Sequence, residues 1–197
     1  MKNNKLFIFT TNKNKIIEIK KNLPKKLFKI IFLNNNYKIK APKENGKTFK
    51  INAMIKSKFG YNIFKTPCVA DDSGICINAL NNGPGVHSNR FQKKIGGYKK
   101  AFNKIIKLTK QKNNYKAVFI SVISYTYKKN KTVTFKGITR GFIINKPIGK
   151  RGFGYDPIFR PYNSKKTYGQ MTKKEKNLVG HRGKALKKLL NYIKKIN

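Results

Sequence analysis

The acidic residues are the first place to look for chemistry, because the 197-residue chain contains only six of them. They stand beside 47 Lys and Arg residues, which gives a formal net charge of +41. With the two histidines, these side chains supply every carboxylate and imidazole available for acid–base catalysis or for binding a hard cation. Any such chemistry must use members of one short list: Glu18, Glu44, Asp71, Asp72, Asp156, Glu175, His87 and His181.

Two of these acids are adjacent, in the segment Asp71-Asp72-Ser73-Gly74 that follows apolar Cys68-Val69-Ala70. Paired carboxylates at the end of a strand suit Mg²⁺ with a bound phosphate. Because successive residues of a strand point to opposite faces, we expect only one of the two aspartates to face a ligand. The other aspartate then caps a turn with Ser73 and Gly74. The alternative to a metal site is an Asx-turn without metal.

A polar loop, Thr10-Thr11-Asn12-Lys13-Asn14-Lys15, connects a predicted strand to a predicted helix. Backbone N–H groups and the dipole at a helix N-terminus favour phosphate, and Lys15 adds positive charge. The loop lacks the glycines and the Gly-Lys-Ser/Thr ending of a Walker loop. It is therefore compatible with a phosphate site, but the residues alone favour the alternative, an ordinary helix cap in a lysine-rich chain.

Further candidates lie near the C-terminus. In Phe153-Gly154-Tyr155-Asp156, an aromatic ring can stack on a base while the carboxylate accepts hydrogen bonds from ring N–H groups. Lys176 and Gly180-His181-Arg182 lie near the start of the last predicted helix, another place where anions and ligands commonly bind. A packed aromatic turn and a capping histidine are the alternatives without a ligand. His87-Ser88 has no acid nearby in the sequence, so a nucleophilic triad has little support.

Strands alternating with helices must position these residues. We expect strands at Lys5–Thr10, Phe28–Leu33, Pro67–Asp71 and Ile75–Ile77, and a hairpin of Lys116–Tyr127 and Thr132–Ile144. Loops are expected at Asn34–Gly46, Asn81–Arg90 and Gly149–Pro161. With neither an internal repeat nor a long linker, the pattern predicts a mixed α/β fold in one domain over residues 1–197.

The helices are predicted from apolar faces and caps. One follows the Thr10–Lys15 loop and ends near Pro24, and another is capped by Thr48. A third carries Tyr98–Ile106, and a capping box of Thr172 and Glu175 opens a fourth. The last helix spans about His181–Lys195.

The charge suggests a nucleic-acid-binding protein, but the composition argues against that interpretation. Lys outnumbers Arg by 42 to 5, whereas bidentate phosphate and base recognition favours Arg. The lysines are spread from Lys2 to Lys195, and Lys, Asn and Ile all have A/T-rich codons. We interpret the excess as compositional drift and expect no specific nucleic acid. Binding through alternating basic and aromatic residues such as Tyr125–Lys131 remains the second hypothesis.

The sequence also bounds the compartment. No apolar run approaches the roughly 18 residues of a membrane span, and Leu6–Phe9 is shorter than the about 7–15 residues of a signal-peptide core. The two cysteines, Cys68 and Cys76, supply neither a disulfide framework nor a metal quartet. We therefore expect a soluble, cytoplasmic protein with no membrane partner.

Five motifs in order resemble one family, the inosine/xanthosine triphosphate pyrophosphatases, which remove non-standard purine nucleotides. The resemblance spans nearly the whole chain. The motifs are Thr-x-Asn-x-x-Lys-x-x-Glu (10–18), Ala-Asp-Asp-Ser-Gly (70–74), Gly-Pro-Gly-Val-x-Ser-x-Arg (83–90), Gly-Phe-Gly-Tyr-Asp-Pro-Ile-Phe (152–159) and His-Arg-Gly-Lys-Ala-Leu (181–186).

This resemblance implies an elongated mixed β-sheet flanked by helices, with two lobes and a cleft between them, and a homodimer. The implied reaction is Mg²⁺-dependent hydrolysis of ITP, dITP and XTP to the monophosphate and pyrophosphate. Asp72 is then the residue that binds metal and activates water. The implied substrate-binding residues are Thr10, Thr11, Asn12, Lys13, Asn14, Lys15, Lys56, Ser73 and Lys176 for the phosphates, and Phe153, Gly154, Tyr155, Asp156, His181 and Arg182 for the base.

The chain departs from the family pattern at several positions. Family members usually have Gly where Thr11 stands, often another Gly at Asn14, and commonly Ser at Gly180. Lys43 replaces the first Glu of a Glu-Glu-Thr-Gly segment, a proposed second metal ligand, and the neighbouring Glu44 is the remaining candidate.

Overall fold

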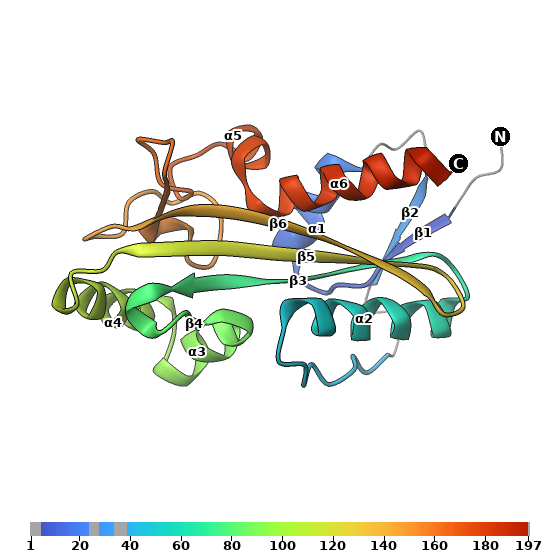
Figure 1. Cartoon of the computed structure of the whole chain (residues 1–197), viewed down its shortest axis with the longest axis horizontal. Coiled ribbons are helices and arrows are strands. Elements are labelled where there is room, and N and C mark those ends of the chain that lie inside the picture. The colour runs from blue at the N-terminus through green and yellow to red at the C-terminus, as the bar shows by residue number, and fades with distance from the viewer. Residues whose placement is uncertain (1–4, 24–27, 34–38, 197) are drawn as a thin grey trace. The chain divides into compact units, whose positions relative to one another are not determined.

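The computed structural model describes residues 5–23, 28–33 and 39–196 and confirms the predicted mixed α/β class (Figure 1). The strands are β1 Lys5–Ile8, β2 Lys29–Phe32, β3 Cys68–Ile77, β4 Gly83–Pro84, β5 Lys116–Lys128, β6 Lys131–Ile143 and β7 Phe159–Pro161. The helices are α1 Lys13–Asn22, α2 Phe49–Phe64, α3 Ser88–Ile95, α4 Tyr98–Gln111, α5 Lys173–Val179 and α6 His181–Ile196. Pro24 and part of the predicted Asn34–Gly46 loop lie outside the described residues.

The strands form one mixed sheet in the order β2-β1-β3-β5-β6-β7, with β4 paired to β3. β1 is parallel to both β2 and β3, whereas β4 and β7 pair in antiparallel fashion. Phe7 of β1 is in register with Cys68 of β3. Continuing this register by three residues brings the start of the Thr10–Lys15 loop level with Asp71.

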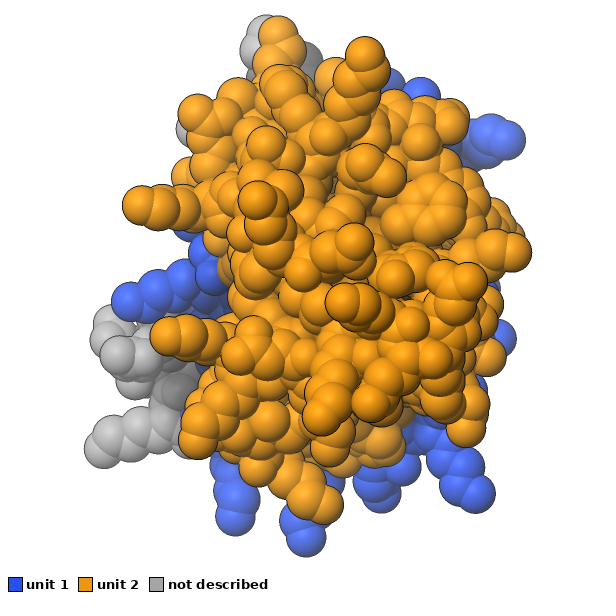
Figure 2. All heavy atoms as spheres, turned by 90° about the vertical axis from the view of Figure 1, so that its left-hand side faces the viewer, with its two compact units in different colours: residues 1–72, 121–137, 182–197 blue, residues 73–120, 138–181 orange. Residues whose placement is uncertain are grey.

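The chain divides into two compact units (Figure 2). Unit 1 contains residues 1–72, 121–137 and 182–197, and unit 2 contains residues 73–120 and 138–181. The two lobes of the predicted fold correspond to these units, and the cleft stays a prediction. β3, β5 and β6 each contribute residues to both units.

Unit 1 has an apolar core on each face of its strands. Leu6 and Ile8 of β1 and Val69 of β3 pack with α1 and α6. The alternate residues of the same strands pack with aromatic residues of α2. Helices α2 and α6 accordingly cover opposite faces of the unit 1 strands (Figure 1).

Unit 2 has a separate core, in which α4 packs against the unit 2 residues of β3, β5 and β6. Buried Phe119, Phe159 and Tyr168 meet edge to face or at a tilt, with ring centroids 4.9–5.6 Å apart. Two of these aromatic residues come from the segment 152–171, so this core fixes the loop that carries the predicted base-binding residues.

The prediction of two short strands around an acidic turn was wrong. β3 runs without interruption from Cys68 to Ile77, so Asp71, Asp72, Ser73 and Gly74 are all strand residues. Acidic residues and glycine disfavour strands by propensity. Tertiary ion pairs override that preference here, because both carboxylates contact lysines of neighbouring helices.

Two predicted loops also contain regular structure. Asn81–Arg90 includes β4 and the first turn of α3, and Gly149–Pro161 ends in a 3₁₀ turn followed by β7. β4 has two residues and β7 has three, which is too short for local periodicity to reveal them. The caps were predicted correctly: Thr48 accepts a hydrogen bond from Ile51 N, and Thr172 with Glu175 forms a capping box.

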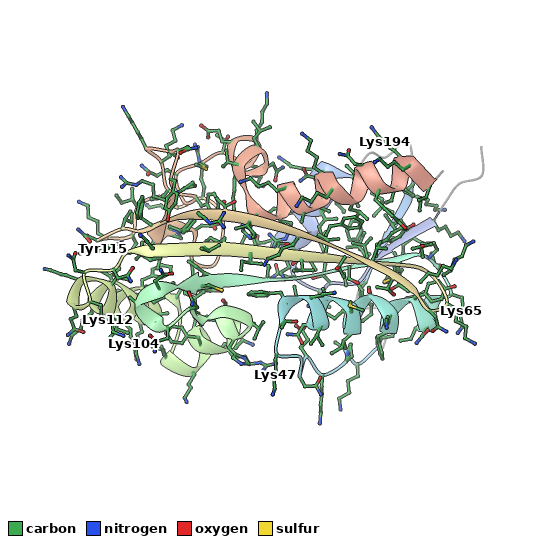
Figure 3. All side chains as sticks on the ribbon, viewed as in Figure 1. Lys47, Lys65, Lys104, Lys112, Tyr115 and Lys194 are labelled. Atoms are coloured by element: carbon green, nitrogen blue, oxygen red, sulfur yellow. The ribbon has the colours of Figure 1, made fainter. Side chains whose placement is uncertain are left out.

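Lysine side chains extend away from the ribbon over much of the chain, as Lys47, Lys65, Lys104, Lys112 and Lys194 illustrate (Figure 3). Among the described residues, we find no helix with the length and hydropathy needed to cross a membrane.

Candidate active site

Every one of the six acidic residues forms an ion pair with a cation. Glu175 lies on α5, where it completes the capping box, and its carboxylate forms an ion pair with Lys166. The other five belong to two groups of side chains. We name them the Asp72 cluster (Lys15, Glu18, Glu44, Lys56, Asp71, Asp72 and Arg182), in unit 1, and the Asp156 cluster (Phe153, Asp156 and Lys176), in unit 2.

Strand alternation decides which way the two adjacent aspartates point. Asp71 follows Val69 on the face covered by α1 and α6, and its carboxylate meets Lys15 Nζ at 2.7 Å and Arg182 Nη2 at 3.3 Å. Asp72 lies on the other face, where Lys56 Nζ of α2 is 3.5 Å from its Oδ1. The expectation that the pair points to opposite faces is confirmed.

Asp71 is the centre of a buried charged network. Its Oδ1 accepts a hydrogen bond from Ser121 Oγ at 2.5 Å, and Arg182 bridges from its Oδ2 to the carboxylate of Glu18. Burial alone would raise the pKa of Asp71, but the charges of Arg182 and Lys15 outweigh it and hold that pKa well below its ordinary range. The carboxylate of Asp71 is therefore ionised, and both of its oxygens already have partners within the protein.

Asp72 has a different environment. Burial raises the pKa of Asp72 above its ordinary value, against the opposing effect of Lys56 and Lys15. Its Oδ1 faces Lys56, but its buried Oδ2 has no hydrogen-bond partner among the described residues. Leaving a buried carboxylate oxygen unsatisfied is costly, so this oxygen is a candidate to receive a ligand.

Lys56 connects Asp72 with Glu44. The ammonium of Lys56 is 3.1 Å from Glu44 Oε2 and 3.5 Å from Asp72 Oδ1, so one cation holds both carboxylates. Carboxylate oxygens are the donors that Mg²⁺ prefers. No group of three or more potential metal-ligating side chains occurs in the part of the chain that the structure describes, so Asp72 and Glu44 are two candidate ligands and not a complete metal centre.

The Thr10–Lys15 loop is held by its own side chains. Asn12 caps α1, its Oδ1 accepting hydrogen bonds from Asn14 N at 3.0 Å and Lys15 N at 3.2 Å. The ordinary helix cap expected as an alternative is thus present. It does not exclude a phosphate site, because the exposed loop leads directly to Lys15, whose ammonium reaches Asp71.

In unit 2, Asp156 organises the Gly-rich loop. Its buried Oδ2 accepts hydrogen bonds from Phe153 N at 2.7 Å and from Lys176 Nζ at 2.5 Å, and that ammonium lies 4.6 Å from the centroid of the Phe153 ring. A Cβ on Gly152, whose φ is +77°, would lie 2.1 Å from the same Oδ2. Gly152 is therefore required for this close approach.

The remaining candidates of unit 2 are anchored by packing. Buried His181 stacks on Phe119, with ring centroids 4.7 Å apart, and Tyr155 donates a hydrogen bond to the Ser88 carbonyl at 2.8 Å. Burial raises the pKa of Tyr155, so this phenol stays protonated. Ser73 and Gly154 lie in β3 and in the Gly-rich loop respectively, both within unit 2.

Sequence reasoning missed Glu18 and Ser121 as parts of the site. Glu18 offered two signals, since it is one of six acids and lies three residues after Lys15 on the same helical face. Ser121 offered none, because it is a small residue within the β-branched run of β5. Only its contact with Asp71 reveals it.

The chain thus combines a mixed α/β fold with two clusters in which carboxylates pair with lysines and Arg182. Comparisons with known proteins place it in a family. The model of the Ham1 family matches residues 6–192, so the chain belongs to the Ham1 family.

Individual relatives match over almost their full length. The chain is 37% identical over 199 residues to a dITP/XTP pyrophosphatase of Aquifex aeolicus, covering 96% of each protein. It is 41% identical over 198 residues to a dITP/XTP pyrophosphatase of Borrelia duttonii, covering 95% of this chain and 96% of that one. A HAM1 protein from Coxiella burnetii has the same fold, with a TM-score of 0.86 and 31% identity over 97% of this chain and 98% of that chain. The resemblance inferred from the motifs is confirmed.

Proposed function

We propose that this protein hydrolyses non-standard purine nucleoside triphosphates, namely ITP, dITP and XTP, to the monophosphate and pyrophosphate. The observation that carries the proposal is the buried Oδ2 of Asp72, which lies near Lys56 and has no hydrogen-bond partner among the described residues. Relatives named dITP/XTP pyrophosphatase support the substrate class. We treat residues 1–197 as one functional domain.

A magnesium ion fits the residues of the Asp72 cluster. Asp72 and Glu44 would hold it, since they present hard oxygen donors and Asp72 Oδ2 has no other partner among the described residues. When bound, Mg²⁺ neutralises phosphate charge and polarises the phosphoryl group.

The chain's own residues then supply orientation and charge. Asp72 orients the attacking water and accepts its proton as the water oxygen forms a bond to the α-phosphorus. The bond from the α-phosphorus to the oxygen that bridges it to the β-phosphorus breaks, and pyrophosphate leaves. Lys15 and Lys56 stabilise the developing charge, with Thr10, Thr11, Asn12, Lys13, Asn14, Ser73 and Lys176 as further phosphate-binding residues.

The purine base of the substrate is assigned to the Asp156 cluster and the residues near it in the sequence. Phe153 stacks on the purine, while Gly154, Tyr155, Asp156 and His181 shape the base site. Arg182 was predicted to donate to the 6-oxo group that distinguishes hypoxanthine and xanthine from adenine. Its guanidinium already contacts Glu18 and Asp71, so a contact with the purine base would compete with these two ion pairs.

The decisive test is pyrophosphate production. We expect purified protein with Mg²⁺ to release pyrophosphate from dITP, ITP and XTP at a kcat/KM well above that for ATP. Release of inorganic phosphate alone, or equal turnover of all purine triphosphates, would contradict the proposal. Nucleic-acid binding, measured at physiological salt, tests the alternative that the protein is a nucleic-acid-binding protein. Weak binding that falls steeply with salt would reflect only the net positive charge.

The first variant prediction concerns stacking. Phe153→Ala is expected to weaken binding of every purine triphosphate alike by about 1–3 kcal/mol, the scale of one base–aromatic contact. Binding constants for dITP and ATP, measured without metal by calorimetry, check this. A selective loss for one base would mean that Phe153 does more than stack.

The second variant prediction asks whether Arg182 contacts the purine base directly or only holds Asp71 and Glu18 in place. If Arg182 donates to the 6-oxo group, Arg182→Ala lowers kcat/KM far more with ITP than with ATP, because adenine presents a donor at that position. If Arg182 acts only through Asp71 and Glu18, both substrates lose equally. The ITP/ATP ratio of kcat/KM distinguishes the two roles.

The third prediction concerns pH. Burial lowers the pKa of Lys15, with Lys56 and Arg182 adding to the effect and Asp71 opposing it. A lysine loses its charge above its pKa, so we expect KM for dITP to rise with increasing pH at a lower pH than an ordinary lysine would require. Lys15→Arg keeps its charge throughout and should abolish this rise. An unchanged KM profile in Lys15→Arg would show that another group titrates.

We further propose a homodimer in the cytoplasm, on the strength of the family resemblance. Sedimentation of the purified protein at micromolar concentration tests the dimer, since a single monomeric species would contradict it.

A further inference from the structure

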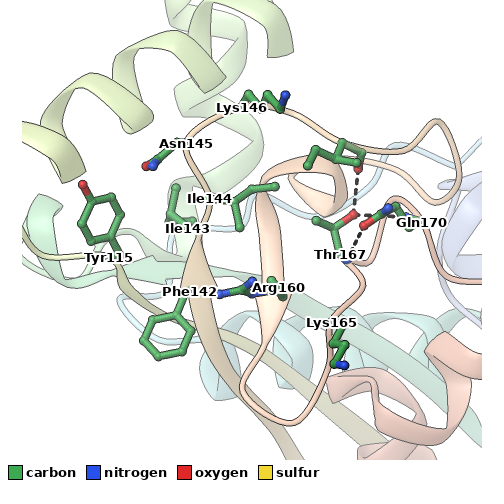
Figure 4. Close-up of a pocket in the computed structure, with 11 residues that line it drawn as sticks. Tyr115, Phe142, Ile143, Ile144, Asn145, Lys146, Arg160, Lys165, Thr167 and Gln170 are labelled. Carbon is green, nitrogen blue, oxygen red and sulfur yellow. Dashed lines mark hydrogen bonds between the residues drawn. The ribbon is translucent and has the colours of Figure 1, made fainter.

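A pocket of about 640 Å³ lies within unit 2, apart from the residues of both clusters (Figure 4). Its volume is within the range of about 300–1,000 Å³ typical of small-molecule sites. It lies at the C-terminal end of β6, beside β7, between the segments 142–148 and 165–170. Nothing in the proposed reaction uses these residues.

The walls of the pocket are apolar and held in place. Phe142, Ile144 and Ile148 provide apolar surface. The backbone N–H groups of Ile144 and Ile148 donate to the carbonyls of Ile158 and Pro157 at 3.0 and 2.9 Å.

The opposite side is braced by hydrogen bonds between Thr167 and Gln170. The backbone N–H of each donates to the side-chain oxygen of the other, at 3.0 and 3.1 Å, and Thr167 Oγ1 donates to Ile148 O at 2.7 Å (Figure 4). The pocket is therefore formed before any ligand arrives.

The charge of the pocket has one sign. Lys146, Arg160 and Lys165 line it, and no acidic residue does so among the described residues. All six carboxylates of the chain are paired with other cations. Lysines are abundant everywhere in this protein, but Arg160 is one of only five arginines. Its planar fork of donors matches a phosphate or carboxylate.

From this combination we infer that unit 2 binds a second ligand, a small organic anion with an apolar ring joined to a phosphate or carboxylate. The ring packs on Phe142 and Ile144, and the anionic group takes the donors of Arg160 and Lys165. An inorganic anion would leave the apolar wall uncovered, and a neutral apolar compound would leave the cations without a counter-charge. Both halves of the pocket are satisfied only by an amphipathic anion.

The experiment uses the full-length protein and four probes at physiological salt: naphthyl phosphate, naphthoate, neutral naphthol and inorganic phosphate. We expect saturable binding of one or both anionic ring compounds. Binding should perturb the methyl resonances of Ile144 and Ile148, and naphthol and inorganic phosphate should bind at least about tenfold more weakly. The first two probes distinguish a phosphate from a carboxylate ligand.

Matched variants place the ligand. Arg160→Gln combined with Lys165→Gln should raise the Kd of the bound ring anion by at least about tenfold, the scale of one charge-assisted hydrogen bond. Lys104→Gln combined with Lys107→Gln removes the same charge from exposed positions of α4 and should change it less than about twofold. Hydrolysis of dITP should be unchanged in both pairs.

Any of four results would overturn the inference. Equal loss in both variant pairs would show that the probe senses only net charge. Displacement by dITP with no effect of Arg160→Gln and Lys165→Gln would place the probe in the substrate site. Binding of naphthol as tight as that of naphthyl phosphate and naphthoate, or no saturable binding at all, would mean that the pocket does not select an anion.

Discussion

Replacing Asp72 with Asn is expected to lower kcat for dITP hydrolysis by about 10²–10⁴, the usual contribution of a positioned general base. The amide keeps the size of the carboxylate but can neither accept the proton of the attacking water nor carry the charge that a metal requires. Pyrophosphate release under saturating dITP and Mg²⁺ measures the effect. The melting temperature should change less than in Asp71→Asn, because Lys56, which pairs with Asp72 Oδ1, keeps its ion pair with Glu44.

The matched control is Glu175→Gln, the same chemical change at an exposed acid of α5 that belongs to neither cluster. We expect its turnover to remain within about twofold of the parent, with at most the modest stability loss of a weakened helix cap. Equal, mild effects of Asp72→Asn and Glu175→Gln would remove Asp72 from the mechanism.

Replacing Asp71 with Asn is expected to act mainly on stability, lowering the free energy of unfolding by about 3–5 kcal/mol. This change leaves Arg182 and Lys15 buried without the carboxylate that both contact. For a chain of this length such a loss corresponds to roughly 6–20 °C in melting temperature. Asp71→Asn should lower kcat less than Asp72→Asn, because the side chain of Asp71 is already occupied.

A double-mutant cycle makes this prediction sharper. Arg182→Met combined with Asp71→Asn should cost less than the sum of the single changes, since removing both partners leaves fewer uncompensated charges. Strict additivity would mean that the Asp71–Arg182 contact contributes nothing. Because the native pKa of Asp71 is depressed, its contribution is present above the ordinary aspartate pKa and is lost as pH falls below about 4.

Local signals were sufficient for many elements of this fold. The helix caps at Thr48 and Thr172, the apolar stripe of α6 and the long β5–β6 pair depend on residues within a few positions of one another, and all were predicted. The β3 strand was not, because its acidic residues contradict strand propensity. What stabilises them comes from far along the chain, as in the pairing of Asp71 with Arg182 across 111 residues.

For the candidate site too, the sequence identified some features and left others to the structure. Scarcity of acidic residues and the order of the motifs singled out Asp72, Lys15, Phe153 and Asp156 without any coordinates. Composition and spacing carry this information because they depend only on which residues are present. They cannot tell which atom of a carboxylate is already satisfied.

Tertiary structure decided how the two adjacent aspartates differ. Their types and their alternation were determined by the sequence, which predicted opposite faces. On one face, α1 and α6 bring Lys15 and Arg182 into contact with the carboxylate of Asp71. On the other face, α2 brings only Lys56 to Asp72, and one carboxylate oxygen has no partner among the described residues. The physical reason is that pKa and hydrogen-bond satisfaction depend on charges and burial within a few ångströms, which distant segments supply.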